Sequence, residues 1–91
     1  MKTGIELIAI ERQEQIEKHG RTIESDVIGN SKRELKNAAM ELIEDWPKFD
    51  DMPNSWKSPI MRHAIQKGYK ERLIIAGALI ASEIDRLQAI E

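Results

Sequence analysis

The stretch YKERLIIAGALIASEIDRL, residues 69–87, decides the fold of this chain. Its apolar residues recur every three or four positions, as on one face of a helix, and further apolar residues cover most of the circumference. That face consists of Leu73, Ala76, Gly77, Ile80, Ile84 and Leu87. Because a helix that is apolar all round is enclosed by other elements, we expect it to be central. Gly77 and Ala81, four residues apart, would let another helix approach closely.

The size of the chain limits how well such a helix can be enclosed. Residues 1–91 are expected to form a single helical domain, and a domain of this size buries about 60–65% of its unfolded surface. Aromatic residues make up only 4% of the chain, which argues against a β-rich fold. The predicted fold class is therefore all-α: a small bundle of three to four helices with a long apolar C-terminal helix, completed by homo-oligomerisation.

Several classes of function are disfavoured by composition. The chain has no cysteine, so it has no disulfide, thiolate nucleophile or zinc–thiolate site. The net charge of −2 gives no general attraction to DNA, RNA or anionic membranes. No signal peptide is recognisable, and the longest apolar run, residues 73–81, is too short to span a membrane. We expect a cytoplasmic protein.

The first helix is predicted over residues 3–19, with Gly20 at its C-terminal end. Its apolar face carries an arginine, Arg12, where another core residue is expected. Two interpretations stay open. Arg12 either forms a buried ion pair with Glu83 or Asp85 of the last helix, since an unpaired buried charge is costly, or it lines an anion pocket.

The middle of the chain is predicted to contain two further helices. Ser31 and Glu34 match a capping box, and the apolar pattern that follows ends before Pro47. That pattern consists of Leu35, Ala38, Ala39, Leu42, Ile43 and Trp46. A short helix is expected over residues 59–67, whereas residues 21–30 and 47–58 are interpreted as loops. Trp56, in the second loop, either fills the core or stacks on a ligand, and filling is commoner.

Basic residues gather around Gly68, where the helical pattern is interrupted. A helix that begins there would offer N–H groups to a phosphate, and Tyr69 or Trp56 could stack on a base. The simpler alternative is a solvated surface cluster. The candidate ligand-binding residues are Arg12, Trp56, Arg62, Lys67, Tyr69, Lys70 and Arg72.

Acidic and histidine residues give weaker signals. Glu41 and Glu44 form one of several ExxE pairs, a spacing that helical bundles use to hold Mg²⁺ but that more often marks a solvated face. His19 and His63 are not at metal-ligand spacing. We therefore expect no metal site and no cofactor. The chain also has no phosphate-binding loop and no nucleophile elbow, so we expect no covalent catalysis.

Two segments resemble a family of small phage and prophage proteins. They are ERQEQIEKHGRT, residues 11–22, and YKERLIIAGALIASEIDRL, residues 69–87. In these two regions, members of that family have sequences similar to ERQRQIExEGWTxEHDD and DLVKAGALIAAEIDRL. The Trp, His and second Asp of the first pattern are here Arg21, Ser25 and Val27. The resemblance implies an infected or lysogenic bacterial host.

The same family is likened to MazG-type all-α nucleoside triphosphate pyrophosphohydrolases, which hold Mg²⁺ with an ExxE helix and an ExxD helix. Glu41 and Glu44 would supply the first pair. Glu71 and Glu83 would belong to the second, but Ile74 and Arg86 stand where its aspartate is required. The resemblance therefore implies an incomplete set of metal ligands.

We expect a phage-type protein that binds an anionic, nucleotide-like ligand between subunits without catalysis, sequestering a nucleotide signal of host defence. One alternative is a Mg²⁺-dependent pyrophosphohydrolase that uses Glu41, Glu44, Glu71 and Glu83. The other is a helical interaction or scaffold protein that binds a partner through its apolar faces.

Overall fold

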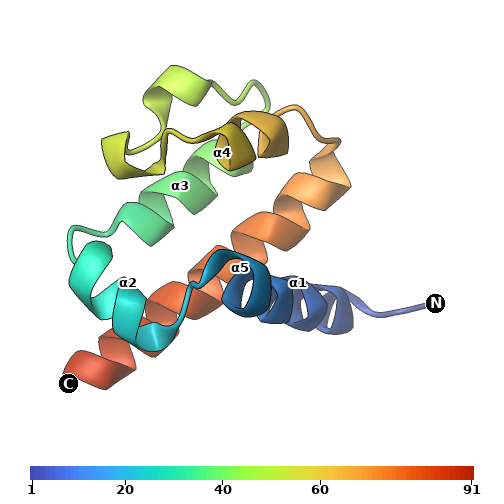
Figure 1. Cartoon of the computed structure of the whole chain (residues 1–91). Coiled ribbons are helices and arrows are strands. Elements are labelled where there is room, and N and C mark those ends of the chain that lie inside the picture. Colours follow the sequence, from blue (N-terminus) through green and yellow to red (C-terminus); the bar gives the residue numbers. More distant parts are fainter.

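The computed structural model describes all residues, 1–91, and the chain is all-α (Figure 1). The helices are α1 (Gly4–His19), α2 (Ile23–Gly29), α3 (Glu34–Leu42), α4 (Pro59–Ala64) and α5 (Tyr69–Ile90), with 3₁₀ turns η1 (Phe49–Asp51) and η2 (Asn54–Trp56). The predicted all-α class and the long C-terminal helix are confirmed. None of the helices combines the length and apolar character that crossing a membrane requires.

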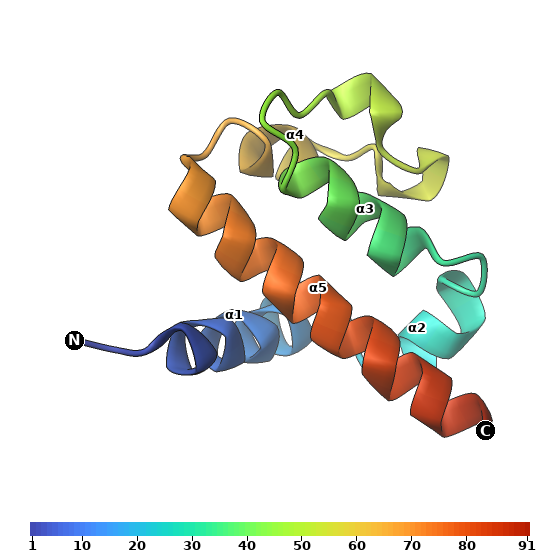
Figure 2. The ribbon, with the colours of Figure 1, turned by 180° about the vertical axis from the view of Figure 1, so that it is seen from behind.

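The C-terminal helix α5 organises the fold. Helices α1, α2 and α3 all pack against it, whereas α4 and the two 3₁₀ turns lie above α3 (Figures 1 and 2). The buried apolar residues come mainly from α3, η2, α4 and α5 and form one cluster. It contains Leu35, Ala38, Ala39, Leu42, Met52, Trp56, Met61, Ala64, Ile75, Ala76 and Leu79. The core therefore fills the space between α5 and the layer above it.

Helix α1 begins and ends close to the predicted positions. Thr3 and Glu6 form a capping box at its start, and Gly20 ends it in the left-handed conformation at φ 62°. The helix crosses α5 at Gly77, where an added Cβ would lie 2.6 Å from the Cδ1 atom of Ile8. The predicted close approach of another helix is thus confirmed at Gly77.

The predictions for residues 21–46 were partly wrong. Residues 23–29 form α2 instead of a loop, because the Thr22 side chain caps the backbone N–H of Ser25. The capping box at Ser31 does not form. Helix α3 starts at Glu34 instead, after Arg33 turns the chain with φ 63°. Helix α3 ends at Leu42, four residues before Trp46, where the predicted helix ended.

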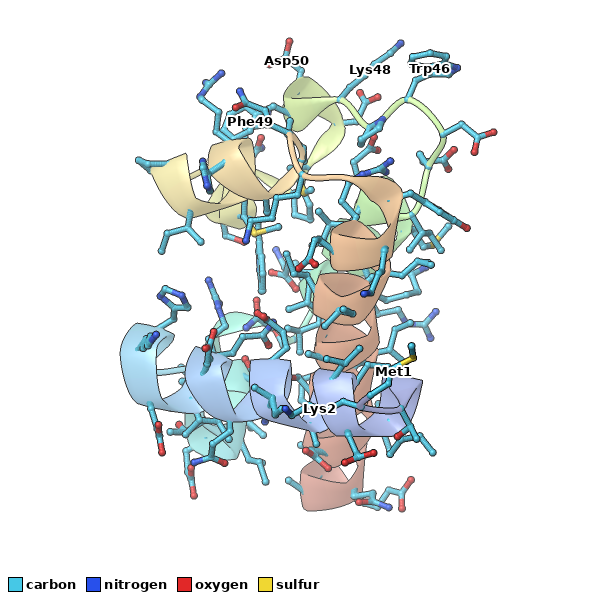
Figure 3. All side chains as sticks on the ribbon, turned by 90° about the vertical axis from the view of Figure 1, so that its right-hand side faces the viewer. Met1, Lys2, Trp46, Lys48, Phe49 and Asp50 are labelled. Atoms are coloured by element: carbon cyan, nitrogen blue, oxygen red, sulfur yellow. The ribbon has the colours of Figure 1, made fainter.

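Two predictions about burial had different outcomes. Trp56 fills the core, with 2% of its surface exposed, as the commoner interpretation predicted. Trp46 was expected on the apolar face of its helix, but it is 85% exposed and points away from the molecule (Figure 3). Helix α5 is also not enclosed on all sides within one chain, since Ile84 is 52% exposed.

Candidate functional site

Arg12 forms the predicted ion pair between the first and last helices. Its Nη2 atom lies 3.6 Å from Oδ2 of Asp85, and its Nη1 donates to the Arg21 carbonyl at 2.7 Å. The side chain is only 12% exposed. Of the two predicted carboxylates, Glu83 is bound by Arg86 instead, at 2.6 and 3.0 Å. Arg12 therefore ties α1 to α5 and to the turn before α2.

Arg72 is also held within the protein. From the first turn of α5 it donates to the carbonyls of Leu42 and Glu44, both at 2.7 Å, and to that of Lys67 at 3.1 Å. The carbonyls at the end of a helix have no partner inside that helix. Arg72 supplies donors to the chain at and just beyond the end of α3, and with only 8% of its surface exposed it is not accessible to a ligand.

The remaining predicted ligand residues do not come together. Arg62 is exposed and stacks on Phe49, with 4.0 Å between its Cζ atom and the ring centroid. Tyr69 and Lys70 are exposed at the start of α5. Of the seven predicted residues, only Trp56 and Lys67 line the cavity between α1 and α4. The basic cluster around Gly68 is thus not one site.

A cavity of about 440 Å³ lies between α1 and α4, within a single chain. Figure 3 shows the two helices facing each other, with α5 alongside and side chains directed into the space between them. Its apolar lining comes from Trp56, Ile60, Met61, Ala64, Ile75 and Leu79, and its polar lining from Glu11, Glu14, Gln15, His19, Arg21, His63 and Lys67. Such a cavity has the size and mixed lining of a small-molecule site.

The polar lining follows a spacing that the sequence displays. Glu11, Gln15 and His19 stand four residues apart and therefore on successive turns of one face of α1. From Glu11 to His19 the helix rises about 12 Å. Along that distance the side chains that line the cavity change from the carboxylate of Glu11 to the imidazole of His19, and Arg21 lies just beyond the helix. The sequence interpretation missed this face because it followed the apolar pattern that contains Arg12.

Arg21 is the cation that the sequence analysis did not single out. Its guanidinium lies 3.8 Å from the centroid of the Trp56 ring, and it donates none of the side-chain hydrogen bonds and forms none of the ion pairs within the protein. Partial burial lowers the pKa of Arg21, and the nearby charge of Asp26 opposes that shift. A guanidinium with unused donors thus forms part of the cavity wall.

A buried chain of hydrogen bonds holds the tryptophan in place. Trp56 Nε1 donates to Asn30 Oδ1 at 2.7 Å, and Asn30 Nδ2 donates to Asp26 Oδ1 at 2.8 Å. Asp26 is fully buried and its Oδ2 atom has no partner. Burial raises the pKa of Asp26, although Asn30 and the nearby charges of Arg12 and Arg21 act the other way.

The raised pKa gives a pH-dependent prediction for Asp26→Asn. Because the folded state favours the protonated acid, this group stabilises the fold below its unfolded pKa, and that stability is lost as the pH rises through the folded pKa. We expect Asp26→Asn to have a higher Tm than the wild type at pH 7, with a smaller difference at pH 4. Thermal unfolding followed by circular dichroism at both values measures this.

The exposed Asp45 supplies the matched control, since Asp45→Asn should change Tm little and equally at the two pH values. A lower Tm for Asp26→Asn at pH 7 would contradict this prediction. It would mean that attraction to Arg12 and Arg21 outweighs the cost of burying the Asp26 carboxylate.

The four carboxylates of the alternative enzyme hypothesis are dispersed. Glu41 accepts a hydrogen bond from the Lys48 backbone at 2.7 Å and lies with Glu44 on the surface. Glu71 and Glu83 are twelve residues apart on α5, or about 18 Å along its axis. No group of three or more acidic or histidine residues is placed to hold a metal ion.

No protein-family model matches the chain, and no curated protein or solved structure matches it either. The resemblance of residues 11–22 and 69–87 to a phage family therefore stays a prediction.

Proposed function

We propose that this protein binds a small anionic, nucleotide-like ligand in the cavity between α1 and α4 and does not transform it. The observation that carries the proposal is Arg21, whose guanidinium is partly desolvated, stacked on Trp56 and free of protein acceptors. Charge-assisted hydrogen bonds from a guanidinium to a phosphate are among the stronger polar interactions, and guanidinium geometry suits phosphate oxygens.

The polarity of the cavity supports a ligand with two different ends. His19 ends α1 and Arg21 lies two residues beyond it, where both would face the phosphate, while Glu11 and Glu14 stand one to two turns earlier on the helix. Carboxylates accept hydrogen bonds, so the acidic end suits the amino group of a nucleobase. The apolar lining, including Ile75, would contact the flat base. Lys67 would add positive charge.

Binding without catalysis is favoured by the dispersal of the carboxylates described above. Phosphoryl chemistry relies on metal ions and positioned charges around the reacting phosphate, and the cavity offers only Glu11 and Glu14 as acids. The corresponding cellular role is sequestration of a nucleotide signal in the cytoplasm of a bacterial host, by analogy with other phage proteins.

We also propose that the chain associates with copies of itself. Large apolar side chains on the surface support this, since Ile80, Ile84 and Leu87 of α5 are each 42–52% exposed. Extended exposed apolar patches commonly mark interaction sites.

Arg21→Gln tests the ligand proposal. The variant removes the positive charge and the guanidinium donors, so we expect affinity to fall about 10- to 100-fold, as for the loss of a hydrogen bond to a charged group. The Trp46→Phe background leaves Trp56 as the single tryptophan, and its fluorescence reports binding at the cavity. The probes are adenosine and guanosine mono-, di- and triphosphates, cyclic nucleotides and inorganic phosphate, with calorimetry as a second readout.

Arg62→Gln is the matched control, because Arg62 is an exposed arginine that stacks on Phe49 outside the cavity, and its variant should bind like the wild type. Absence of heat and of fluorescence change with every probe would refute the proposal. Release of phosphate or pyrophosphate from a triphosphate in the presence of Mg²⁺ would refute binding without catalysis.

A further inference from the structure

An uncovered apolar stripe runs along α5. It consists of Tyr69, Leu73, Ile80, Ile84 and Leu87, each between 40% and 56% exposed, and we call it the α5 stripe. These residues share one face of the helix, on a different side from the buried Ile75, Leu79 and Ser82 that face the core. From Tyr69 to Leu87 the stripe spans about 27 Å.

No other element of the chain covers this face. Helix α1 occupies the adjoining flank of α5, through Ile8 at Gly77 and through the Arg12–Asp85 ion pair. Figure 2 shows α5 running along the near side of the molecule with no helix in front of it. The stripe is thus the exposed remainder of a helix whose other faces are packed.

We propose that the α5 stripe is the contact with a second copy of this chain, with the two α5 helices packed antiparallel. This rests on the self-association proposed above and specifies its surface. The stripe is nearly symmetric about Ile80. If two α5 helices pack antiparallel with a two-fold axis at Ile80, Leu73 lies opposite Leu87 of the second copy. The same patch then serves both subunits, as in the commonest class of oligomer.

The charges at the two ends of the stripe favour the antiparallel orientation. Lys70 lies at the N-terminal end, Glu91 follows the last residue of α5 at the other end, and both are exposed. The proposed axis brings Lys70 near Glu91 of the second copy at each end of the interface. A parallel pair would place like charges together and would align the helix dipoles unfavourably.

Engineered cysteines test the orientation directly, because the chain has none of its own. Leu73→Cys and Leu87→Cys variants are oxidised separately and as an equimolar mixture, and the products are separated on a non-reducing gel and mapped by mass spectrometry. We expect a 73–87 disulfide in the mixture and little crosslinking of either variant alone. Efficient crosslinking of each variant with itself would overturn the antiparallel arrangement.

Sedimentation equilibrium tests the surface independently of the orientation. Ile84→Glu should weaken the dimer at least about tenfold, as expected when a charge is buried in an apolar contact. Ile28→Glu is the matched control, because Ile28 is 84% exposed on α2, outside the stripe. Circular dichroism checks that both variants retain their helices, and the cysteine result stands if Ile84→Glu does not fold.

The possible failures are distinguishable. A wild-type chain that stays monomeric at all concentrations overturns self-association and this interface together. A wild-type dimer that Ile84→Glu leaves intact, with no 73–87 disulfide, overturns only the α5 stripe as the interface. Neither outcome bears on nucleotide binding in the cavity, which is measured separately.

Discussion

Trp56→Ala is expected to lower the free energy of unfolding by about 3–5 kcal/mol, the range for deleting a buried tryptophan side chain. Trp56 is 2% exposed and packs in the core cluster beneath the cavity. Its loss leaves a void and removes the donor to Asn30 Oδ1. Because small domains have only about 5–15 kcal/mol of stability, the variant should be close to unfolding. Urea unfolding followed by circular dichroism measures the change.

Two variants separate packing from hydrogen bonding at this position. Trp56→Phe keeps most of the apolar contact but leaves Asn30 Oδ1 without a donor, so we expect a smaller loss of about 1–3 kcal/mol. Trp46→Phe changes a tryptophan that is 85% exposed and should alter stability by less than about 0.5 kcal/mol. Equal losses for the variants at positions 46 and 56 would contradict the role of Trp56 in the core.

Arg72→Met is expected to lower the free energy of unfolding by at least about 3 kcal/mol. Methionine has a similar length and no donor, so the carbonyls of Leu42, Glu44 and Lys67 all lose their hydrogen bonds from Arg72. A buried polar group left without a partner costs about 1–3 kcal/mol; the hydrogen bond to Leu42 is buried and the other two are partly buried. Urea unfolding measures the loss, and hydrogen exchange should locate increased opening at residues 42–46.

Arg72→Lys tests whether the forked guanidinium is required. A lysine keeps the charge but cannot reproduce the planar set of donors, so this variant should recover only part of the lost stability. Lys70→Met provides the control, since Lys70 is exposed two residues before Arg72 on the same helix and should be replaceable with little effect on the stability of the fold. The capping role would be refuted if Arg72→Met were no less stable than Lys70→Met.

Much of the fold could be predicted from the sequence, because helices are governed by local spacing. The apolar pattern of residues 69–87 predicted α5, and Gly20 marked the end of α1. The end of α3 could not be predicted in this way. Its apolar pattern continues to Trp46, but the guanidinium of Arg72, thirty residues beyond Leu42, holds the carbonyls where the helix stops. That hydrogen bond is invisible to any local pattern.

The candidate site was predicted less well, for a related reason. The positions of basic residues in the sequence predicted that Arg12 and Arg72 bind a ligand. In the structure, both side chains donate hydrogen bonds to acceptors within the protein. Arg21, in a segment interpreted as a loop, keeps its donors free. The signal that could have helped is the repeat of Glu11, Gln15 and His19 at intervals of four residues, which marks a second inward face of α1.

The sequence by itself determined that this chain is helical, that α5 is its longest and most apolar helix, and that Arg12 needs an anionic partner, either a carboxylate of the last helix or a bound anion. These follow from helical periodicity and from the cost of burying an unpaired charge. Only the tertiary structure decided which cations remain available, where the cavity lies and which face of α5 stays uncovered. Each of these depends on contacts between segments distant in sequence, and a free donor is defined by which acceptors the fold brings within about 3 Å.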